Sequence, residues 1–190
     1  MNRPATLLVL LLAGLLAGCG GGSRPTGIRA AETPADDVAE YQPRWRSHTV
    51  DSTQYRKVFL AGTIDMGRSS DWQAALVARF RDSIGGRWLF FNPRRREFHA
   101  SPAEMEYQVA WELAHLEAAD LIVMNLLGDS RSPISLLEMG LYARSGKLFV
   151  ACSSDYYRYD NVRITCRRYG VPLYDSLTAL LDDLPQQSDE

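Results

Sequence analysis

Short apolar runs alternate along this chain with segments of helical periodicity, and this alternation constrains the fold most. The runs are continuous in their apolar character, which is typical of strands buried on both faces of a sheet. They lie at residues 57–61, 87–91, 121–125, 147–152 and 171–174. The helical segments, several with capping residues or an early proline, lie at 72–82, 101–118, 134–144 and 176–184.

Strands that alternate with helices predict a mostly parallel sheet with helices on both faces. Five strands favour an α/β protein with a flavodoxin-like three-layer α/β/α sandwich. In such sheets a ligand binds beyond the carboxyl ends of the strands, where the strand order reverses. Within the helix predicted at 101–118, Met105, Val109 and Leu113 share one face.

The first nineteen residues predict an export signal. Arg3 precedes an uncharged apolar run, residues 7–17, which is too short for a permanent membrane-spanning helix. Residues 16–19, Leu-Ala-Gly-Cys, resemble the lipobox of bacterial lipoproteins, in which the cysteine is acylated and becomes the mature N-terminus. Acyl chains such as palmitate on Cys19 would hold the protein at a membrane. The alternative is an ordinary signal peptide with a chance cysteine at position 19.

Composition after Cys19 predicts a flexible linker over residues 20–54, rich in Gly, Pro, Ala and Asp. A folded domain is expected at 55–185 and a short tail at 186–190. Enterobacterial lipoproteins retained in the inner membrane favour aspartate after the acylated cysteine, whereas Gly20 stands here. The predicted location is therefore the bacterial cell envelope, in the outer membrane facing the periplasm.

Charge and cysteine content exclude several classes of protein. With Lys+Arg 21 against Asp+Glu 23, the net charge is -2, which argues against nucleic-acid binding. Three cysteines and three histidines without metal-ligand spacing predict neither a metal nor a cofactor. Because an oxidising compartment permits disulfides, Cys152 and Cys166 are expected either to be bonded or to be two buried thiols.

Glu138 is the strongest candidate for chemistry. It lies early in the helix predicted at 134–144, after the third strand, with apolar neighbours on both sides. Backbone dipoles near a helix N-terminus would keep its carboxylate ionised. A positioned carboxylate is what nucleophilic attack on an anomeric carbon requires. The alternative is a solvated glutamate on a helix surface.

Glu112 and His115 are three positions apart and share a helix face. They form either a proton-transfer pair or a surface pair without a role. Asp120, at the amino end of the third strand, is expected to be structural.

Two loops beyond strand ends contain candidate ligand-binding residues. Gly62, Thr63 and Asp65 follow the first strand, where glycine lets a ligand approach the backbone or simply permits a turn. Asn92 and Arg94 follow the second strand and suit an anionic or carbonyl-rich ligand, or lie in a solvated loop.

Four motifs together resemble the nucleoside 2-deoxyribosyltransferase family, over residues 57–184. They are Val-Phe-Leu-Ala-Gly at 58–62, Asn-Pro-Arg at 92–94, Trp-Glu at 111–112 ahead of Ala-Asp-Leu-Ile-Val at 119–123, and Leu-Glu-Met-Gly-Leu-Tyr-Ala at 137–143. The resemblance implies a flavodoxin-like fold and transfer of 2-deoxyribose between nucleobases, with retention and without a metal. The implied partner is a nucleoside or nucleobase-like small molecule.

The resemblance also implies roles for individual residues. Glu138 matches the nucleophile, and Glu112 matches a second carboxylate that is an aspartate in characterised members. Asp129 is the acid available in the loop before the nucleophile helix. Phe59 stands where characterised members have a tyrosine. Asn161 matches a residue contributed by a neighbouring subunit, so a homo-oligomer is expected.

The implied reaction has two outcomes. Glu138 would attack the anomeric carbon while an acid, Glu112 or Asp129, protonates the departing base. Resolution by a second base gives transfer, and resolution by water gives hydrolysis. Because free nucleobases are scarce outside the cytoplasm, two alternatives stand beside the transferase: an N-glycoside (nucleoside) hydrolase, and a non-catalytic ligand-binding envelope lipoprotein.

Overall fold

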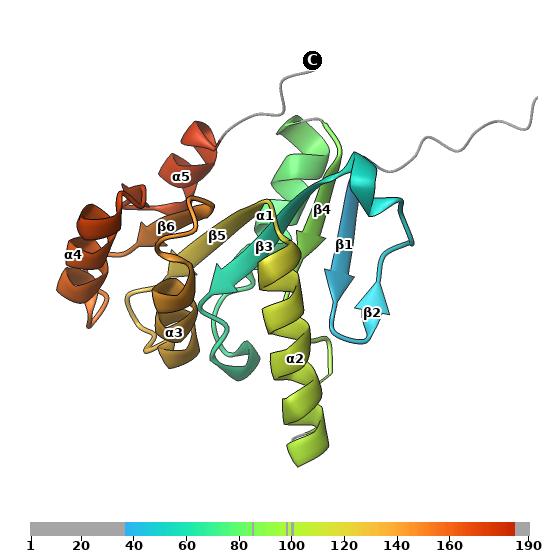
Figure 1. The fold of residues 1–190 in the computed structure, drawn as a ribbon, viewed down its shortest axis with the longest axis horizontal. Coiled ribbons are helices and arrows are strands. Elements are labelled where there is room, and N and C mark those ends of the chain that lie inside the picture. Colours follow the sequence, from blue (N-terminus) through green and yellow to red (C-terminus); the bar gives the residue numbers. More distant parts are fainter. Residues whose placement is uncertain (1–36, 85, 98, 100, 185–190) are drawn as a thin grey trace, which may run out of the picture. The chain divides into compact units, whose positions relative to one another are not determined.

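Seven strands form one sheet in the order β2-β1-β4-β3-β5-β6-β7 (Figure 1). This computed structural model describes residues 37–84, 86–97, 99 and 101–184. The strands are β1 (Val38–Gln42), β2 (Trp45–Arg46), β3 (Arg56–Gly62), β4 (Trp88–Phe91), β5 (Leu121–Leu126), β6 (Leu148–Cys152) and β7 (Leu173–Tyr174). The helices are α1 (Trp72–Arg79), α2 (Pro102–Ala118), α3 (Pro133–Tyr142), α4 (Tyr159–Tyr169) and α5 (Leu177–Asp183).

The five strands expected from the apolar runs are β3 to β7. Numbered among themselves along the chain, they lie in the order 2-1-3-4-5, which is the order of a flavodoxin-like sheet. Every neighbouring pair in the sheet is parallel except β1 with β2. The predicted fold class is therefore confirmed, with two strands more than expected.

The extra strands correct the predicted linker of residues 20–54. β1 pairs in parallel with β4, and β2 turns back along β1. Val38, Ala39 and Tyr41 are buried by this pairing, which is why the segment folds onto the sheet despite its linker-like composition. The predicted signal peptide with Cys19, residues 20–36 and the tail at 186–190 lie outside the described residues.

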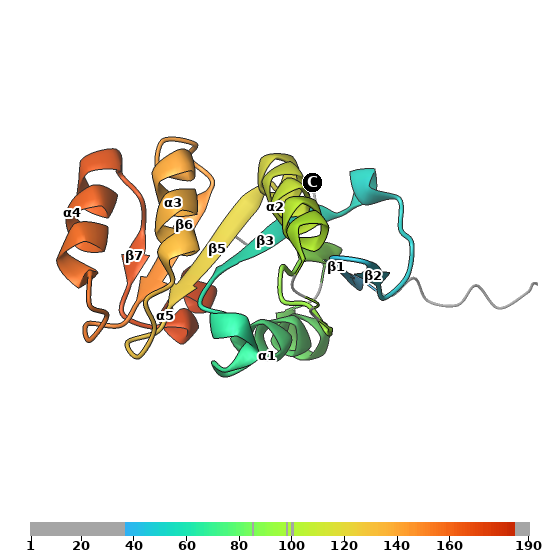
Figure 2. The same ribbon diagram turned by 90° about the horizontal axis from the view of Figure 1, so that it is seen from below.

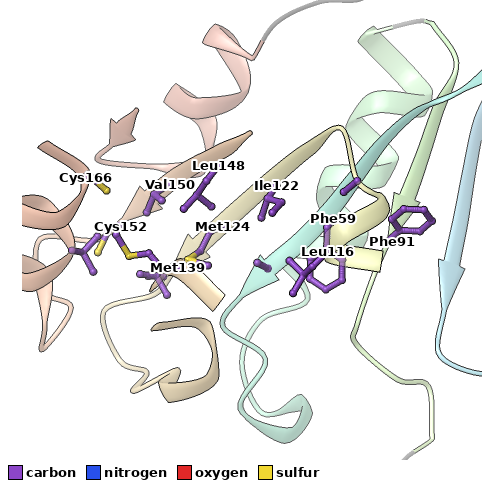
Figure 3. Close-up of a cluster of buried hydrophobic side chains, with 14 of the residues drawn as sticks. Phe59, Phe91, Leu116, Ile122, Met124, Met139, Leu148, Val150, Cys152 and Cys166 are labelled. Carbon is purple, nitrogen blue, oxygen red and sulfur yellow. The ribbon is translucent and has the colours of Figure 1, made fainter. Parts of the chain in front are cut away.

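Helices cover both faces of the sheet (Figure 2). α2, α3 and α4 lie on one face, and α1 and α5 lie on the other. Successive residues of the central strands point to opposite faces: Phe59 and Ile122 join the core under α2 to α4, whereas Val58 and Val123 join the core under α1 and α5. Burial on both sides explains why these strands are continuous apolar runs. Figure 3 shows the first of these cores.

α2 begins where its capping residues predict, but it does not pack by its regular apolar face. Ser101 accepts a hydrogen bond from the Glu104 amide at 3.1 Å and caps the helix. The periodic residues Met105, Val109 and Leu113 are exposed. Gln108 and Leu116 are the buried residues of this helix instead, so α2 turns a partly polar face towards the sheet.

Gly62 ends β3 at the closest approach between the two central strands. Its φ is +123°, and an added Cβ would lie 2.2 Å from the carbonyl oxygen of Asn125. Glycine is therefore required at this position by the backbone of β5. The group that closely approaches Gly62 is the neighbouring strand β5, and a ligand contact at Gly62 stays a prediction.

Candidate functional site

Side chains from α2 and α3 meet near the carboxyl ends of β3 and β5. The connection from β3 leads outward to β4 and the connection from β5 leads the other way to β6, so the strand order reverses between β3 and β5. A sheet of this type places its ligand site at such a reversal. α3 follows β5 directly and contains Glu138, while α2 precedes β5 and contains Glu112.

Glu138 is buried, with 8% of its surface exposed. Burial raises the pKa of its carboxyl to about 8, and the nearby charge of Glu112 adds to the increase. Within the described ranges, no hydrogen bond or ion pair engages this carboxyl. The expectation that helix dipoles keep it ionised is therefore wrong for the free protein. Glu138 lies beyond the first turn of α3, where the dipole effect has largely decayed, and desolvation dominates.

Glu112 is half-buried and lies close enough to Glu138 to influence its titration. Burial raises the pKa of Glu112, and a hydrogen bond from Gln108 opposes that increase. Two carboxyls that interact in this way titrate as a pair, because ionising both places two like charges in a poorly solvated site. Near neutral pH the pair therefore holds one proton between two carboxyls.

Aromatic rings pack beside this pair. Phe59 lies 6.3 Å from Trp111 between ring centroids, and Trp111 stacks on His115 at 4.0 Å. His115 also meets Phe91 edge-on at 4.5 Å, and its Nδ1 lies 2.7 Å from the carbonyl oxygen of Trp111. Burial lowers the pKa of His115, which favours a neutral ring. His115 is therefore held in an aromatic stack.

A chain of hydroxyl groups ties the loop after β3 to the start of α3. The Thr63 hydroxyl lies 2.8 Å from that of Ser132, which lies 2.7 Å from that of Ser130. Ser130 in turn donates to Asp65 Oδ1 at 2.9 Å. Ser132 has a φ of 38°, in the left-handed region that disfavours residues with a side chain. The network holds this strained turn in place and fixes where α3 begins.

Ser130 and Ser132 were not among the predicted site residues. The available signal was the Ser-Arg-Ser-Pro sequence immediately before a helix, which marks a polar turn. Thr63 and Asp65 were predicted as ligand contacts, and both direct side-chain oxygens into this network. Thr63 is fully buried, so its hydroxyl serves the loop geometry.

Asn92 and Arg94 are buried and bonded within the protein. Asn92 donates to Glu40 at 2.7 Å and accepts from the Arg94 amide at 3.0 Å. The Arg94 guanidinium reaches the Ser69 hydroxyl at 3.0 Å and Gln73 Oε1 at 3.2 Å. These contacts anchor the β3–α1 loop, so the present geometry assigns both residues to the scaffold around the site. A contact with ligand stays a prediction for each.

Asp129 and Asn161 belong to other elements than the two glutamates. Asp129 is exposed in the loop between β5 and α3. Asn161 lines a hollow of about 300 Å³ between α3 and α4. The lining residues of this hollow are Leu136, Met139, Gly140, Arg158, Asn161, Val162 and Thr165.

Cys152 and Cys166 are free, buried thiols in the same core cluster (Figure 3). Burial raises the pKa of Cys152 to about 12, with a smaller contribution from the neighbouring Cys166, whose own pKa burial raises to about 11. The sequence left open a disulfide or two buried thiols, and the structure has two buried thiols.

The described residues contain neither a candidate metal site nor a helix suited to cross a membrane. In that part of the chain, no group of three or more His, Cys, Asp or Glu side chains is placed to hold a metal ion. Over the same ranges, no helix is both long and apolar enough to cross a membrane.

A family model described as nucleoside 2-deoxyribosyltransferase like matches residues 55–156. The match starts just before β3, includes Glu112 and Glu138, and ends before α4. No curated protein matches the chain.

The buried Glu138 makes a prediction about stability. Its pKa rises from an ordinary 4.5 to about 8 on folding, so the folded chain holds this proton more tightly than the unfolded chain. The stabilisation is complete below about pH 4.5 and is lost as the pH rises through about 8, at about 1.4 kcal/mol per unit of pKa difference. Glu138→Gln keeps the shape of the protonated acid without titrating. We expect this variant to become more stable than the parent by a few kcal/mol as the pH increases.

Urea unfolding at about pH 5 and about pH 9 measures this difference. Glu106→Gln on the exposed side of α2 is the matched control and should show no such trend. A stability difference for Glu138→Gln that is the same at both pH values would contradict the prediction.

Proposed function

The chain belongs to the nucleoside 2-deoxyribosyltransferase-like family, and we propose that it transfers 2-deoxyribose between nucleobases through a covalent intermediate on Glu138. One observation carries the proposal: Glu138 is buried beside a second carboxyl, Glu112, and no protein donor in the described residues occupies it. A carboxyl without an ion pair, next to a second carboxyl that can share its proton, suits displacement at an anomeric carbon.

The proton shared by Glu112 and Glu138 can protonate the departing base. In the free protein this proton is on Glu138 and Glu112 is charged, because Glu138 has the more strongly raised pKa. When substrate binds, the proton passes to Glu112 and Glu138 becomes a carboxylate. Glu138 then attacks the anomeric carbon, the bond to the base nitrogen breaks, and Glu112 delivers the proton to that nitrogen. The products are a glycosyl ester on Glu138, a neutral base and the Glu112 carboxylate, so charge and protons balance.

Resolution of the ester decides the activity. A second nucleobase that attacks the anomeric carbon, losing its proton to Glu112, completes a transfer and restores the starting pair. Water attacking in the same way gives hydrolysis.

Incubation of the purified chain with deoxyadenosine and cytosine tests this proposal. We expect deoxycytidine to form, and Glu138→Gln to lower the rate by at least about 10³-fold because the nucleophile is lost. Glu112→Gln should lower it by about 10²-fold or more because proton delivery is lost. The exposed Glu106→Gln variant is the control with an unchanged rate.

Each other outcome of that assay has a definite meaning. Free base and deoxyribose without deoxycytidine would replace the transferase with a nucleoside hydrolase. Thermal stabilisation by nucleosides without any turnover would leave a ligand-binding envelope protein. Full activity of Glu138→Gln would remove the nucleophile from the proposal.

We propose further that the chain is a lipoprotein attached to the cell envelope through Cys19, in the outer membrane and facing the periplasm. The Leu-Ala-Gly-Cys sequence and the apolar run before it support this. From Cys19 to the first described residue, Asp37, the chain is long enough to separate the domain from the bilayer by several nanometres when extended.

Expression in a bacterial host supplied with labelled palmitate measures the anchor. We expect label on the full chain and recovery of the protein in the membrane fraction. Cys19→Ala should lose the label, since no thiol remains for acylation at that position. Equal labelling of Cys19→Ala and the parent would rule out this site of attachment.

Self-association is the remaining proposal, and the surface of α2 and α3 supports it. Six large apolar side chains, between 44% and 61% exposed, lie on these two neighbouring helices: Met105, Val109, Leu113, Ile134, Leu137 and Leu141 (Figure 2). Apolar side chains exposed together on neighbouring helices form a patch of the kind that marks protein interaction surfaces.

Charge around this patch favours a second copy of the chain as its partner. The exposed charges of α2 beside it are acidic, Glu106 and Glu117, whereas those at the two ends of α3 are basic, Arg131 and Arg144. A two-fold arrangement that sets α2 of one copy against α3 of the other pairs opposite signs twice.

Sedimentation analysis of the chain at about 10 μM tests this surface, and a dimer or larger assembly is expected. Leu137→Glu should yield a monomer because it buries an unpaired charge at the contact. Ile164→Glu, a similarly exposed position on α4, is the control and should leave the assembly intact. A parent protein that is monomeric throughout would contradict the proposal.

A further inference from the structure

Gln108 connects the glutamate pair to the scaffold. It is buried on α2, one helical turn before Glu112. Its side-chain Nε2 donates two hydrogen bonds, one to Glu112 Oε1 at 2.7 Å and one to the carbonyl oxygen of Pro93 at 3.0 Å. Pro93 lies in the loop between β4 and α2, so the amide is held from two directions.

The two acceptors fix the orientation of this amide. A flipped amide would direct its oxygen at the carbonyl of Pro93 and at the carboxyl of Glu112, both of which are acceptors. In the observed orientation Gln108 Oε1 is buried and has no hydrogen-bond partner. A buried acceptor without a partner destabilises the fold, and the two bonds that the amide donates only partly offset this.

The fixed N–H group of Gln108 makes Glu112 and Glu138 differ in how readily they ionise. Glu112 Oε1 always faces a donor, which favours the ionised form of Glu112 and confines any proton to Oε2. In the described residues, Glu138 has no comparable donor. We infer that Gln108 is a positioning residue that keeps Glu112 as the charged member of the pair and leaves the shared proton on Glu138.

The other titratable groups near the pair do not supply this asymmetry. From α3, Tyr142 lies near Glu138, and burial raises the pKa of its phenol, with smaller contributions from Glu117 and Glu138. On α2, His115 is engaged by the Trp111 carbonyl, and Arg46 of β2 acts on His115. Gln108 alone among these donates a hydrogen bond to Glu112.

The inference deepens the proposed function and rests on it for its consequence in catalysis. With Oε1 bound to Gln108, Glu112 must receive and release the proton at Oε2. An N–H bond on one oxygen makes the protonated group a better donor from the other oxygen, which helps the base to leave. Gln108 therefore sets both the route of the proton and the strength of the acid.

Titration of the carboxyl carbons by NMR in the free protein tests the inference without turnover. Gln108→Met retains length and removes both donors. We expect the midpoint of Glu112 to rise by about one pH unit, and that of Glu138 to fall as Glu112 loses its charge. Gln73→Met, which also deletes a buried amide but one that bonds Arg94, is the matched control and should leave both midpoints in place. Unchanged midpoints in a folded Gln108→Met would overturn the inference.

A second measurement in the unmodified protein covers the case in which Gln108→Met does not fold. The side-chain amide protons of Gln108 should shift with pH at the midpoint of Glu112, because they are bonded to its Oε1. Amide resonances that do not respond at that midpoint would overturn the inference as well.

Kinetics then separate this inference from the proposed function. If the chain turns over nucleosides, the acid limb of kcat/KM in Gln108→Met should move to higher pH by the same amount as Glu112, whereas a merely structural loss would lower the rate without moving the limb. If no turnover occurs at all, the proposed function fails, and the NMR result still decides the role of Gln108.

Discussion

The parallel pairing of β3 with β5 is the constraint on which the remaining structure depends. The two backbones close on each other where Gly62 lies opposite Asn125, and the Thr63 amide donates to the Asn125 carbonyl at 2.9 Å. No side chain fits at Gly62, so the strands end together. From this point one loop leads to α1 and the other to α3, and the hydroxyl chain through Thr63 and Ser132 joins them again. The position of Glu138 follows from that junction, because α3 starts there.

A buried carboxyl pair requires that the elements carrying the two acids are held rigidly in place. Two acids in a poorly solvated space repel each other when both are charged, and a flexible framework would relieve the repulsion by moving them apart. Here α2 is fixed through Gln108 to the β4 loop and α3 is fixed through Ser132 to the β3 loop. Burial therefore raises the pKa of Glu138, and the repulsion by Glu112 adds to that rise instead of moving the two acids apart. Such a pair suits the reaction proposed above, in which one carboxylate is consumed as an ester.

Sequence reasoning identified the fold and the two acids but not the residues that hold them. The continuous apolar strands and the flanks of Glu138 carry a strong local signal, because burial on both faces leaves no polar alternation. The sequence pattern of α2 is misleading. Met105, Val109 and Leu113 have regular helical spacing but are exposed, whereas Gln108 is buried. α4 was missed because only Val162 and Cys166 of its residues are buried. The burial expected from the sequence pattern and the observed burial disagree most near the glutamate pair. A residue there is chosen for its hydrogen bonds and not for apolar packing.

Phe59, in place of a tyrosine, and Glu112, in place of an aspartate, have related effects on Glu138. In the characterised enzymes that this chain resembles, a tyrosine and an aspartate stand at these two positions. Phe59 offers no hydroxyl and packs on Trp111, and within the described residues no donor from β3 reaches the Glu138 carboxyl. Without that donor the carboxylate of Glu138, the proposed nucleophile, is harder to form, and a base that removes its proton becomes more important. Glu112, one methylene longer than aspartate and anchored at one oxygen by Gln108, extends its other oxygen as that base. The loss of a hydrogen bond to the nucleophile is thus matched by a neighbouring carboxylate that is held ready to accept its proton.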